Sequence, residues 1–229
     1  MTTILVAGAT GAIGTALVPY LRARGFEVIP HVRPKTAARH ALGKDPAALV
    51  ADLSESAKLD AKMARAQAVV CLVGTMRRRF SAGDTYESSD YRPVVQLMES
   101  ARRVPAKEPR LFVLLSALGA RKGSGYLGWK HKAEEVVRTG GLPNAILRPS
   151  FLDTTANAAL PSDGKQRKPP PLVGGLLGLL GAFPPLRGLS DDLRPIPAEA
   201  ICAAITRIVR ERAPLGTLTG RQLWAAAAS

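Results

Sequence analysis

The stretch Thr3-Ile4-Leu5-Val6-Ala7-Gly8-Ala9-Thr10-Gly11-Ala12-Ile13-Gly14 decides the fold of this chain. Its apolar beginning, residues 4–7, predicts a β-strand, and the glycine-rich part predicts a tight turn. A helix is predicted to follow, because apolar residues recur every three or four positions as far as Leu21. Strand, glycine turn and amphipathic helix in this order are typical of a site that holds the phosphates of a dinucleotide.

Each of the three glycines in this turn has a separate expected task. Gly8 allows the tight turn where the strand ends, Gly11 lets the backbone approach a pyrophosphate, and Gly14 lets the helix pack closely on the strand. The N-terminal end of the helix offers N–H groups to an anion. The alternative is an ordinary strand-to-helix turn without a ligand. We expect the cofactor phosphates to be bound by Gly8, Thr10, Gly11, Ala12, Ile13 and Gly14.

Length and composition indicate a single domain. The 229 residues are 46% hydrophobic, which is enough for a sizeable core, and no linker-like stretch divides them. The start of the chain lacks the basic and apolar regions of a secretory signal, so we expect a cytoplasmic protein. Its two cysteines lie far apart and its three histidines lack ligand spacing, so neither a disulfide nor a metal site is expected.

The formal charge of +14 leaves three kinds of anionic partner open: nucleic acid, a membrane surface, or a phosphate-rich small molecule. The basic residues are scattered, and no helix-turn-helix, zinc-finger or RNA-binding motif accompanies them. Nucleic-acid binding is therefore not expected, and a solvated basic surface is the simpler explanation. A phosphate-rich cofactor accounts for only part of the charge.

The second predicted strand, residues 26–33, determines which cofactor is expected. An NAD site places an acidic residue at the end of this strand for the ribose 2′-hydroxyl, whereas an NADP site places a basic residue there for the 2′-phosphate. Residues 28–44 contain no acid, and they contain Arg33, Lys35 and Arg39. We therefore expect NADP rather than NAD, with Arg33 as the main contact. The alternative is that these basic residues lie on an exposed helix.

Two further strands are expected at residues 47–51 and 67–73. The first ends at Asp52-Leu53 and the second at Gly74-Thr75. In a doubly wound sheet, ligands lie beyond the carboxyl ends of parallel strands. Arg33, Asp52, Leu53, Gly74 and Thr75 are therefore expected to face the same crevice as the glycine turn.

Strand and helix patterns continue to alternate along the chain. Strands are expected at residues 110–115 and 144–147, and helices at 89–103 and 126–139. This alternation gives six strands and predicts an α/β fold, a doubly wound parallel sheet covered by helices on both faces.

Residues 152–195 interrupt the alternation and are expected to form a substrate-pocket wall or lid within the single domain 1–229. They include an apolar piece, residues 172–183, which is too short for a bilayer-spanning helix of about 20 residues. Contact with an anionic membrane surface is a minor alternative. A helix over residues 198–212 and a last strand over residues 216–224 are expected to complete the domain.

The pair Tyr126 and Lys130 predicts proton-transfer chemistry. Their i, i+4 spacing places both side chains on one face of a helix. A neighbouring ammonium stabilises a phenolate, so it lowers the pKa of the tyrosine hydroxyl towards the pH at which the hydroxyl would transfer a proton. Ser116, at the carboxyl end of the preceding strand, is expected to hydrogen-bond the substrate oxygen. The alternative is a chance occurrence of YxxxK.

Taken together, the motifs resemble those of the short-chain dehydrogenase/reductase superfamily. Within it, the chain is similar to the atypical NAD(P)-binding group that includes the Tat-interacting-protein oxidoreductases and the NmrA-like proteins. The resemblance covers nearly the whole length, and it rests on Gly8-Ala9-Thr10-Gly11-Ala12-Ile13-Gly14, Val70-Cys71-Leu72-Val73-Gly74-Thr75, Leu114-Leu115-Ser116, Tyr126 through Lys130, and Leu147-Arg148-Pro149.

This resemblance implies a Rossmann fold and hydride transfer between nicotinamide C4 and a carbonyl or alcohol carbon. Tyr126 would be the general acid/base, Lys130 would hold the nicotinamide ribose and the tyrosine, and Ser116 would polarise the substrate oxygen. By the same resemblance Asp52-Leu53 would contact the adenine. The remaining cofactor contacts implied are Gly74, Thr75, Pro149, Ser150 and Phe151.

The leading expectation is an NADP-dependent oxidoreductase for a small, largely apolar carbonyl or alcohol, acting as a monomer or homodimer. Two departures from the catalytic pattern keep an alternative open. Residues 71–116 contain no Asn on the helix after the fourth strand, and Gly128 interrupts the helix that carries Tyr126 and Lys130. The alternative is an NAD(P)H-binding redox sensor or regulatory protein without turnover.

Overall fold

A computed structural model of the chain describes residues 1–74, 83–153 and 193–228. Its main feature is a seven-stranded, fully parallel sheet with the strand order β3-β2-β1-β4-β5-β6-β9. The strands are β1 (Thr3–Ala7), β2 (Glu27–Val32), β3 (Leu49–Val50), β4 (Ala68–Cys71), β5 (Leu111–Leu115), β6 (Asn144–Arg148) and β9 (Gly216–Thr219). The predicted doubly wound Rossmann-type sheet is confirmed.

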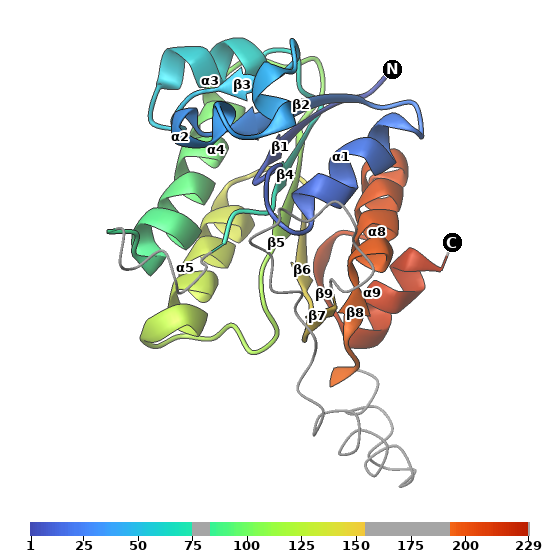
Figure 1. Cartoon of the computed structure of the whole chain (residues 1–229). Helices are drawn as coiled ribbons and strands as arrows, with labels where there is room; N and C mark the ends of the chain where they lie inside the picture. Colours follow the sequence, from blue (N-terminus) through green and yellow to red (C-terminus); the bar gives the residue numbers. More distant parts are fainter. Residues whose placement is uncertain (75–82, 154–192, 229) are drawn as a thin grey trace, which may run out of the picture.

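Helices cover both faces of the sheet (Figure 1). One face carries α1 (Gly14–Arg22), α8 (Ala198–Glu211) and α9 (Gly220–Ala227), and the other carries α3 (Ser56–Met63), α4 (Arg92–Arg103) and α5 (Gly125–Thr139). The described chain also contains three short helical elements: α2 (Pro34–Ala37), the 3₁₀ turn η1 (Ala41–Lys44) and the π-helical turn η3 (Glu87–Tyr91).

The strands are apolar on both faces because both faces are covered. In β1, Ile4 and Val6 belong to the core under α1 and α8, whereas Leu5 and Ala7 belong to the core under α3, α4 and α5. All four side chains are fully buried. A continuous apolar run is what a strand buried on both faces requires, so the sequence pattern and the packing agree.

The strand order creates the crevice in which a ligand can bind. From β1 the chain first extends the sheet through β2 to β3, and then returns to place β4 on the other side of β1. The connections therefore leave β1 and β4 towards opposite faces of the sheet, and a gap opens beyond their carboxyl ends. The glycine turn after β1 lies at this gap.

The C-terminal part differs from the prediction. The last strand ends at Thr219, and Trp224 lies in the helix α9 rather than in a strand. Thr219 and Gln222 form a capping box, in which each side chain bonds the backbone N–H of the other residue. The Thr-x-x-Gln pattern is a helix-start signal, and it stops the strand.

A small parallel sheet joins the start of the segment 152–195 to the residues directly after it. Strand β7 (Leu152–Asp153) pairs with β8 (Ile196–Pro197). The ends of the expected pocket segment therefore lie side by side. Most of that segment, including the apolar piece 172–183, lies outside the described residues. None of the helices in the described ranges is both long and apolar enough to cross a membrane.

Arg110 holds the two helices α3 and α4 at the amino end of β5. Its buried guanidinium donates five hydrogen bonds of 2.7–3.1 Å to carbonyl oxygens of residues 63, 66, 101, 104 and 105. These carbonyls lie at the carboxyl ends of α3 and α4, where backbone acceptors have no partner within the helix. The positive charge there also complements the helix dipoles.

We expect Arg110→Leu to destabilise the protein by about 3 kcal/mol or more, because it leaves several buried carbonyl groups without a donor. Arg102→Leu, on the exposed face of α4, is the control and should change the free energy of unfolding by about 0.5 kcal/mol or less. Urea denaturation measures both. A loss below about 1 kcal/mol for Arg110→Leu would contradict this assignment.

Candidate cofactor and catalytic site

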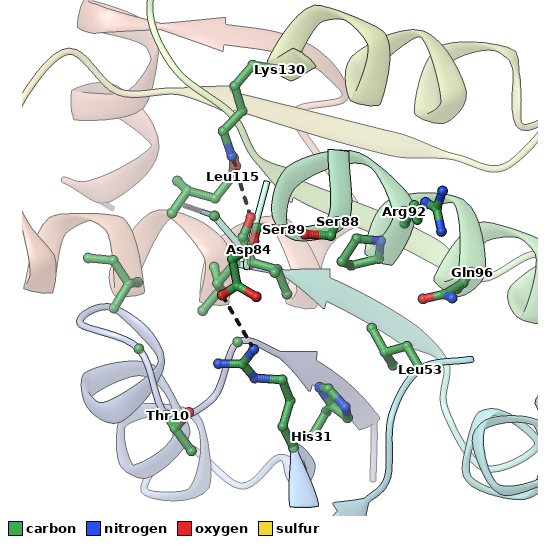
Figure 2. A pocket seen from close by; sticks show the side chains of 18 of the residues that line it. Thr10, His31, Leu53, Asp84, Ser88, Ser89, Arg92, Gln96, Leu115 and Lys130 are labelled. Carbon is green, nitrogen blue, oxygen red and sulfur yellow. Dashed lines mark hydrogen bonds and ion pairs between the residues drawn. The ribbon is translucent and has the colours of Figure 1, made fainter. Parts of the chain in front are cut away.

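A crevice of about 430 Å³ lies beyond the carboxyl ends of the strands. It brings together residues that are far apart in the sequence, from the glycine turn after β1 to the helix α5. The predicted site residues that line it are Gly8, Thr10, Gly11, Ala12, Ile13, Arg33, Asp52, Leu53, Gly74, Ser116, Tyr126 and Lys130. In the view of Figure 2, Lys130 and His31 lie at opposite ends of the crevice, with Asp84 between them.

The glycines of the turn are required by close backbone contacts. Gly8 has a φ of +85°, and a Cβ there would lie 2.9 Å from the carbonyl carbon of Leu72, which follows β4. A Cβ on Gly14 would lie 2.2 Å from the carbonyl oxygen of Gly8. Helix α1 therefore begins directly against the turn, as predicted for the third glycine.

Arg33 lies at the end of the crevice formed by β2. Its guanidinium is 4.0 Å from the Asp84 carboxylate, and its side chain is 45% exposed. Figure 2 marks this ion pair with a dashed line that begins at the Asp84 carboxylate. The Asp84 carboxylate therefore pairs with Arg33, the residue that is expected to bind a 2′-phosphate.

His31 forms part of the same end of the crevice. Its Nε2 donates a hydrogen bond of 2.9 Å to the carbonyl oxygen of Ala51. Burial lowers the pKa of His31, although this hydrogen bond opposes the shift. The ring is therefore neutral at pH 7 and joins β2 to the chain after β3.

Lys130 lies in the floor of the crevice at the opposite end. Its ammonium forms an ion pair of 2.9 Å with Asp90, and it lies 3.4 Å from the Leu115 carbonyl oxygen and 3.5 Å from that of Val73. The Tyr126 ring centroid is 5.7 Å from the ammonium. The expected neighbourhood of Tyr126 and Lys130 is present, and Asp90 adds a carboxylate that the sequence did not suggest.

The Ser116 hydroxyl takes part in a buried network. It donates a hydrogen bond of 2.6 Å to the carboxylate of Glu134 on α5. The same carboxylate accepts hydrogen bonds from Arg148 at 2.5 and 2.8 Å and from Arg138 at 2.6 Å. Ser116 is therefore held with its proton directed to Glu134, and its lone pairs remain as acceptors.

This network also sets the charge of Glu134. Burial raises the pKa of its carboxyl group, but the hydrogen bonds from Arg148, Ser116 and Arg138 outweigh burial and lower the pKa overall. Glu134 is fully buried and ionised at neutral pH. It links β5, α5 and β6 behind the crevice.

Gly128, which interrupts the helical sequence between Tyr126 and Lys130, has a packing reason. A Cβ at this position would lie 2.1 Å from the carbonyl oxygen of Gly123. The loop before α5 therefore packs directly on the helix that carries both predicted site residues. Tyr126 itself is 36% exposed and lines the crevice.

Three predicted cofactor contacts lie after β6 and do not line the crevice. The carbonyl of Pro149 accepts a hydrogen bond from Leu118, Ser150 Oγ donates to the Arg194 carbonyl, and the Phe151 carbonyl accepts from Ile196. Pro149, Ser150 and Phe151 therefore join the end of β6 to neighbouring segments. Gly14, another predicted contact, does not line the crevice either, and Thr75 lies outside the described residues.

The sequence did not identify the side of the crevice formed by η3 and the start of α4. Residues from this region line it, and Figure 2 shows several of them: Ser88, Ser89, Arg92 and Gln96. They follow the polar loop after β4, where no motif marks them. Their position after the carboxyl end of the fourth strand could have indicated that they face the crevice.

No cluster of three or more His, Cys, Asp or Glu side chains that could hold a metal ion occurs in the described parts of the chain. The two cysteines are buried. Burial raises the pKa of the Cys71 thiol to about 11 and that of Cys202 to about 12. Both are therefore neutral thiols at pH 7.

Comparison with known proteins identifies the class to which this fold and crevice belong. A family model described as NAD(P)H-binding matches residues 8–169. The chain belongs to this NAD(P)H-binding family. It has the fold of the short-chain dehydrogenase/reductase superfamily, and its similarities support the atypical group predicted from the motifs.

Two plant proteins and one solved structure are among its similar proteins. The chloroplastic Protein TIC 62 of Pisum sativum is 26% identical over 182 residues, covering 68% of this chain and 34% of that protein. The chloroplastic divinyl chlorophyllide a 8-vinyl-reductase of Oryza sativa subsp. indica is 33% identical over 132 residues, covering 53% of this chain and 31% of that protein. A short-chain dehydrogenase/reductase superfamily protein of Agrobacterium tumefaciens with bound NAD has a TM-score of 0.62 at 18% identity, covering 94% of this chain and 76% of that one.

The chain matches about a third of the length of either plant relative. The family and the fold support binding of a nicotinamide cofactor and a redox role. They do not distinguish NADP from NAD.

We expect Glu134→Gln to destabilise the protein by about 3 kcal/mol at pH 7, because it breaks ion pairs of a fully buried carboxylate and leaves the partly buried Arg148 without its partner. The pKa of Glu134 is lowered from 4.5 in the folded state, so its contribution is present above pH 4.5 and is lost as the pH falls. The difference from wild type should therefore shrink in acid. Urea denaturation at several pH values measures it.

The control is Glu135→Gln, which removes the half-exposed partner of Arg138 on the same helix turn. It should cost about 1 kcal/mol or less. A Glu134→Gln difference that stays constant between neutral pH and about pH 3 would contradict the network described above.

Proposed function

We propose that the protein is an NADP-dependent oxidoreductase that transfers a hydride between nicotinamide and a small, largely apolar carbonyl or alcohol. One observation carries the proposal. Tyr126 and Lys130 line one end of the crevice and Arg33 lines the other, and the glycine turn lines the same crevice. An extended dinucleotide with its diphosphate at the turn would reach both ends. The names of the rice relative, a reductase, and of the NAD-bound neighbour support a redox reaction.

In this proposal the bound nicotinamide supplies or accepts the hydride, and Tyr126 transfers the proton. Tyr126 is suited to this role because it lines the crevice while remaining partly exposed, and the Lys130 ammonium lies 5.7 Å from its ring centroid. The Gly8 turn and the start of α1 would hold the diphosphate.

The role of Ser116 follows from its hydrogen bond to Glu134. Because its proton is donated to that carboxylate, Ser116 is suited to accept a hydrogen bond from an alcohol or a carboxamide N–H. It is less suited to donate one to a carbonyl oxygen. Polarisation of a substrate carbonyl is therefore assigned to Tyr126 alone.

The second candidate is a redox sensor or regulatory protein that binds NAD(P)H without turnover. The commitment of the Ser116 proton to Glu134 and of the Lys130 ammonium to Asp90 favours it. Both groups are then engaged by the protein rather than by a substrate. Tight NADPH binding without oxidation across a broad panel of carbonyl compounds would support this candidate.

Tyr126→Phe should retain NADPH binding and lose about 100-fold or more of the reductase rate, since general acid catalysis contributes about 10²–10⁴-fold. NADPH oxidation with a panel of small apolar aldehydes and ketones measures the rate, and calorimetry measures binding. Tyr86→Phe is the matched control, because the two rings lie with centroids 5.8 Å apart. A Tyr126→Phe variant as fast as wild type would refute the role.

The choice of NADP is tested at Arg33 and Asp84. Arg33→Asp should raise the dissociation constant of NADPH at least about tenfold, because a charge-assisted hydrogen bond to the 2′-phosphate is lost. The dissociation constant of NADH should change much less. Asp84→Asn should lower the dissociation constant of NADPH about threefold, because it removes the carboxylate that competes with the 2′-phosphate for Arg33. Calorimetry with NADPH and NADH measures both changes.

Lys35→Asp carries the same charge change on an exposed position of α2, and it should affect NADPH less than Arg33→Asp does. Equal losses for NADPH and NADH in Arg33→Asp would remove Arg33 from the 2′-phosphate site. NADPH affinity that is unchanged in Asp84→Asn would show that the carboxylate does not compete.

A further inference from the structure

Asp90 is a buried acid directly beneath the catalytic end of the crevice. It lies on the π-helical turn η3, and its side chain is 0% exposed, while that of its partner Lys130 is 4% exposed. The two charged groups are 2.9 Å apart. Lys130 lines the crevice and Asp90 lies behind it. A π-helical turn of this kind is often found at functional sites.

The surrounding backbone leaves just enough room for this ion pair. A Cβ on Gly74 would lie 3.3 Å from the Lys130 ammonium and 3.5 Å from the Asp90 carboxylate. The ammonium also faces the carbonyl oxygens of Val73 and Leu115, at 3.5 and 3.4 Å. Protein acceptors therefore surround the three hydrogen atoms of the ammonium and fix its position.

The pair is ionised and has no net charge. Among the residues that the structure describes, the groups that face Lys130 are Asp90 from η3, Tyr126 from α5 and Cys71 from β4. Burial lowers the pKa of Lys130, but the electrostatic interactions with Tyr126 and Asp90 raise it above its ordinary value overall. The Cys71 thiol, with a pKa of about 11, is neutral at pH 7. Asp90 therefore cancels the charge of Lys130 at this end of the crevice.

The charge of a nicotinamide ring depends on its oxidation state. The ring is positively charged in NADP⁺ and uncharged in NADPH. An uncompensated ammonium in a buried site would repel the oxidised ring and leave the reduced ring almost unaffected. A carboxylate beside the ammonium removes most of this difference.

We propose that Asp90 is a positioning residue that neutralises Lys130 beneath the nicotinamide, so that the site accepts the oxidised cofactor as well as the reduced one. The inference rests on the proposed function, which places the nicotinamide beside Tyr126 and Lys130. It assigns Asp90 to the setting of cofactor redox preference, a role separate from proton transfer.

The test is the ratio of the dissociation constants of NADP⁺ and NADPH, measured by calorimetry. Asp90→Asn should raise this ratio on the order of tenfold, because removal of one buried negative charge leaves the ammonium uncompensated. Lys130→Met should lower the ratio, because it leaves the carboxylate alone. The double variant should return the ratio to within about twofold of wild type, since both charges are then absent.

The pH dependence separates this effect from a loss of structure. In Asp90→Asn the raised ratio should be present at low pH, where Lys130 is protonated, and should decline as the pH rises and the unpaired ammonium loses its proton. In wild type the ratio should change less over the same range. A merely structural role would weaken both nucleotides by the same factor at every pH.

Asp60→Asn is the matched control. It removes an acid that hydrogen-bonds Ser100 and Arg103 on α4, away from the residues that line the crevice, and it should leave the ratio unchanged. Circular dichroism checks folding. If Asp90→Asn does not fold, Lys130→Met and the double variant still decide the question, because their ratios must differ in the stated direction.

The outcomes distinguish this inference from the proposed function. Wild-type protein that binds neither nucleotide would overturn both. Wild-type protein that binds both, with a ratio in Asp90→Asn within about twofold of wild type at every pH, would overturn the role of Asp90 alone.

Discussion

The close contact between two pieces of backbone, at Gly8 and at Gly14, is the constraint on which the rest of the structure depends. A methyl group at Gly14 would lie 2.2 Å from the Gly8 carbonyl oxygen, and one at Gly8 would lie 2.9 Å from the backbone after β4. Because no side chains separate these segments, α1 begins directly at the carboxyl end of β1, next to β4. At that junction the chain stops adding strands on the β2 side of β1 and begins to add them on the β4 side, so the crevice and the glycine turn coincide.

At the end of the crevice that contains Lys130, each buried charged group has a partner of opposite charge. Lys130 is paired with Asp90, and Glu134 is paired with Arg148 and Arg138, all within the elements that surround the carboxyl ends of β4, β5 and β6. Buried ions are tolerated because each has a partner within hydrogen-bonding distance. The pairs hold α5 at a fixed place relative to the sheet, and with it Tyr126. The catalytic and the regulatory proposals both begin from this arrangement.

Much of the fold and part of the candidate site could be predicted. The apolar runs of β1 and β4 identify strands buried on both faces, and the glycine turn locates the crevice. The i, i+4 spacing of Tyr126 and Lys130 places them on one face of α5. The capping box at Thr219 was present in the sequence but was not recognised, so the last strand was extended too far. Pro149, Ser150 and Phe151, which are predicted to contact the cofactor, join β6 to the chain near β8 and do not line the crevice.

The sequence by itself determined the order of strands and helices along the chain, the glycine turn, and which residue types follow each strand, because these depend on local periodicity and on the conformational freedom of glycine. Only the tertiary structure decided which charged groups meet. Asp90 and Lys130 are 40 residues apart in the numbering, and Arg33 and Asp84 are 51 apart. Such pairs form because strand order brings the ends of distant segments to one edge of the sheet, and no local pattern encodes which acid will face which base.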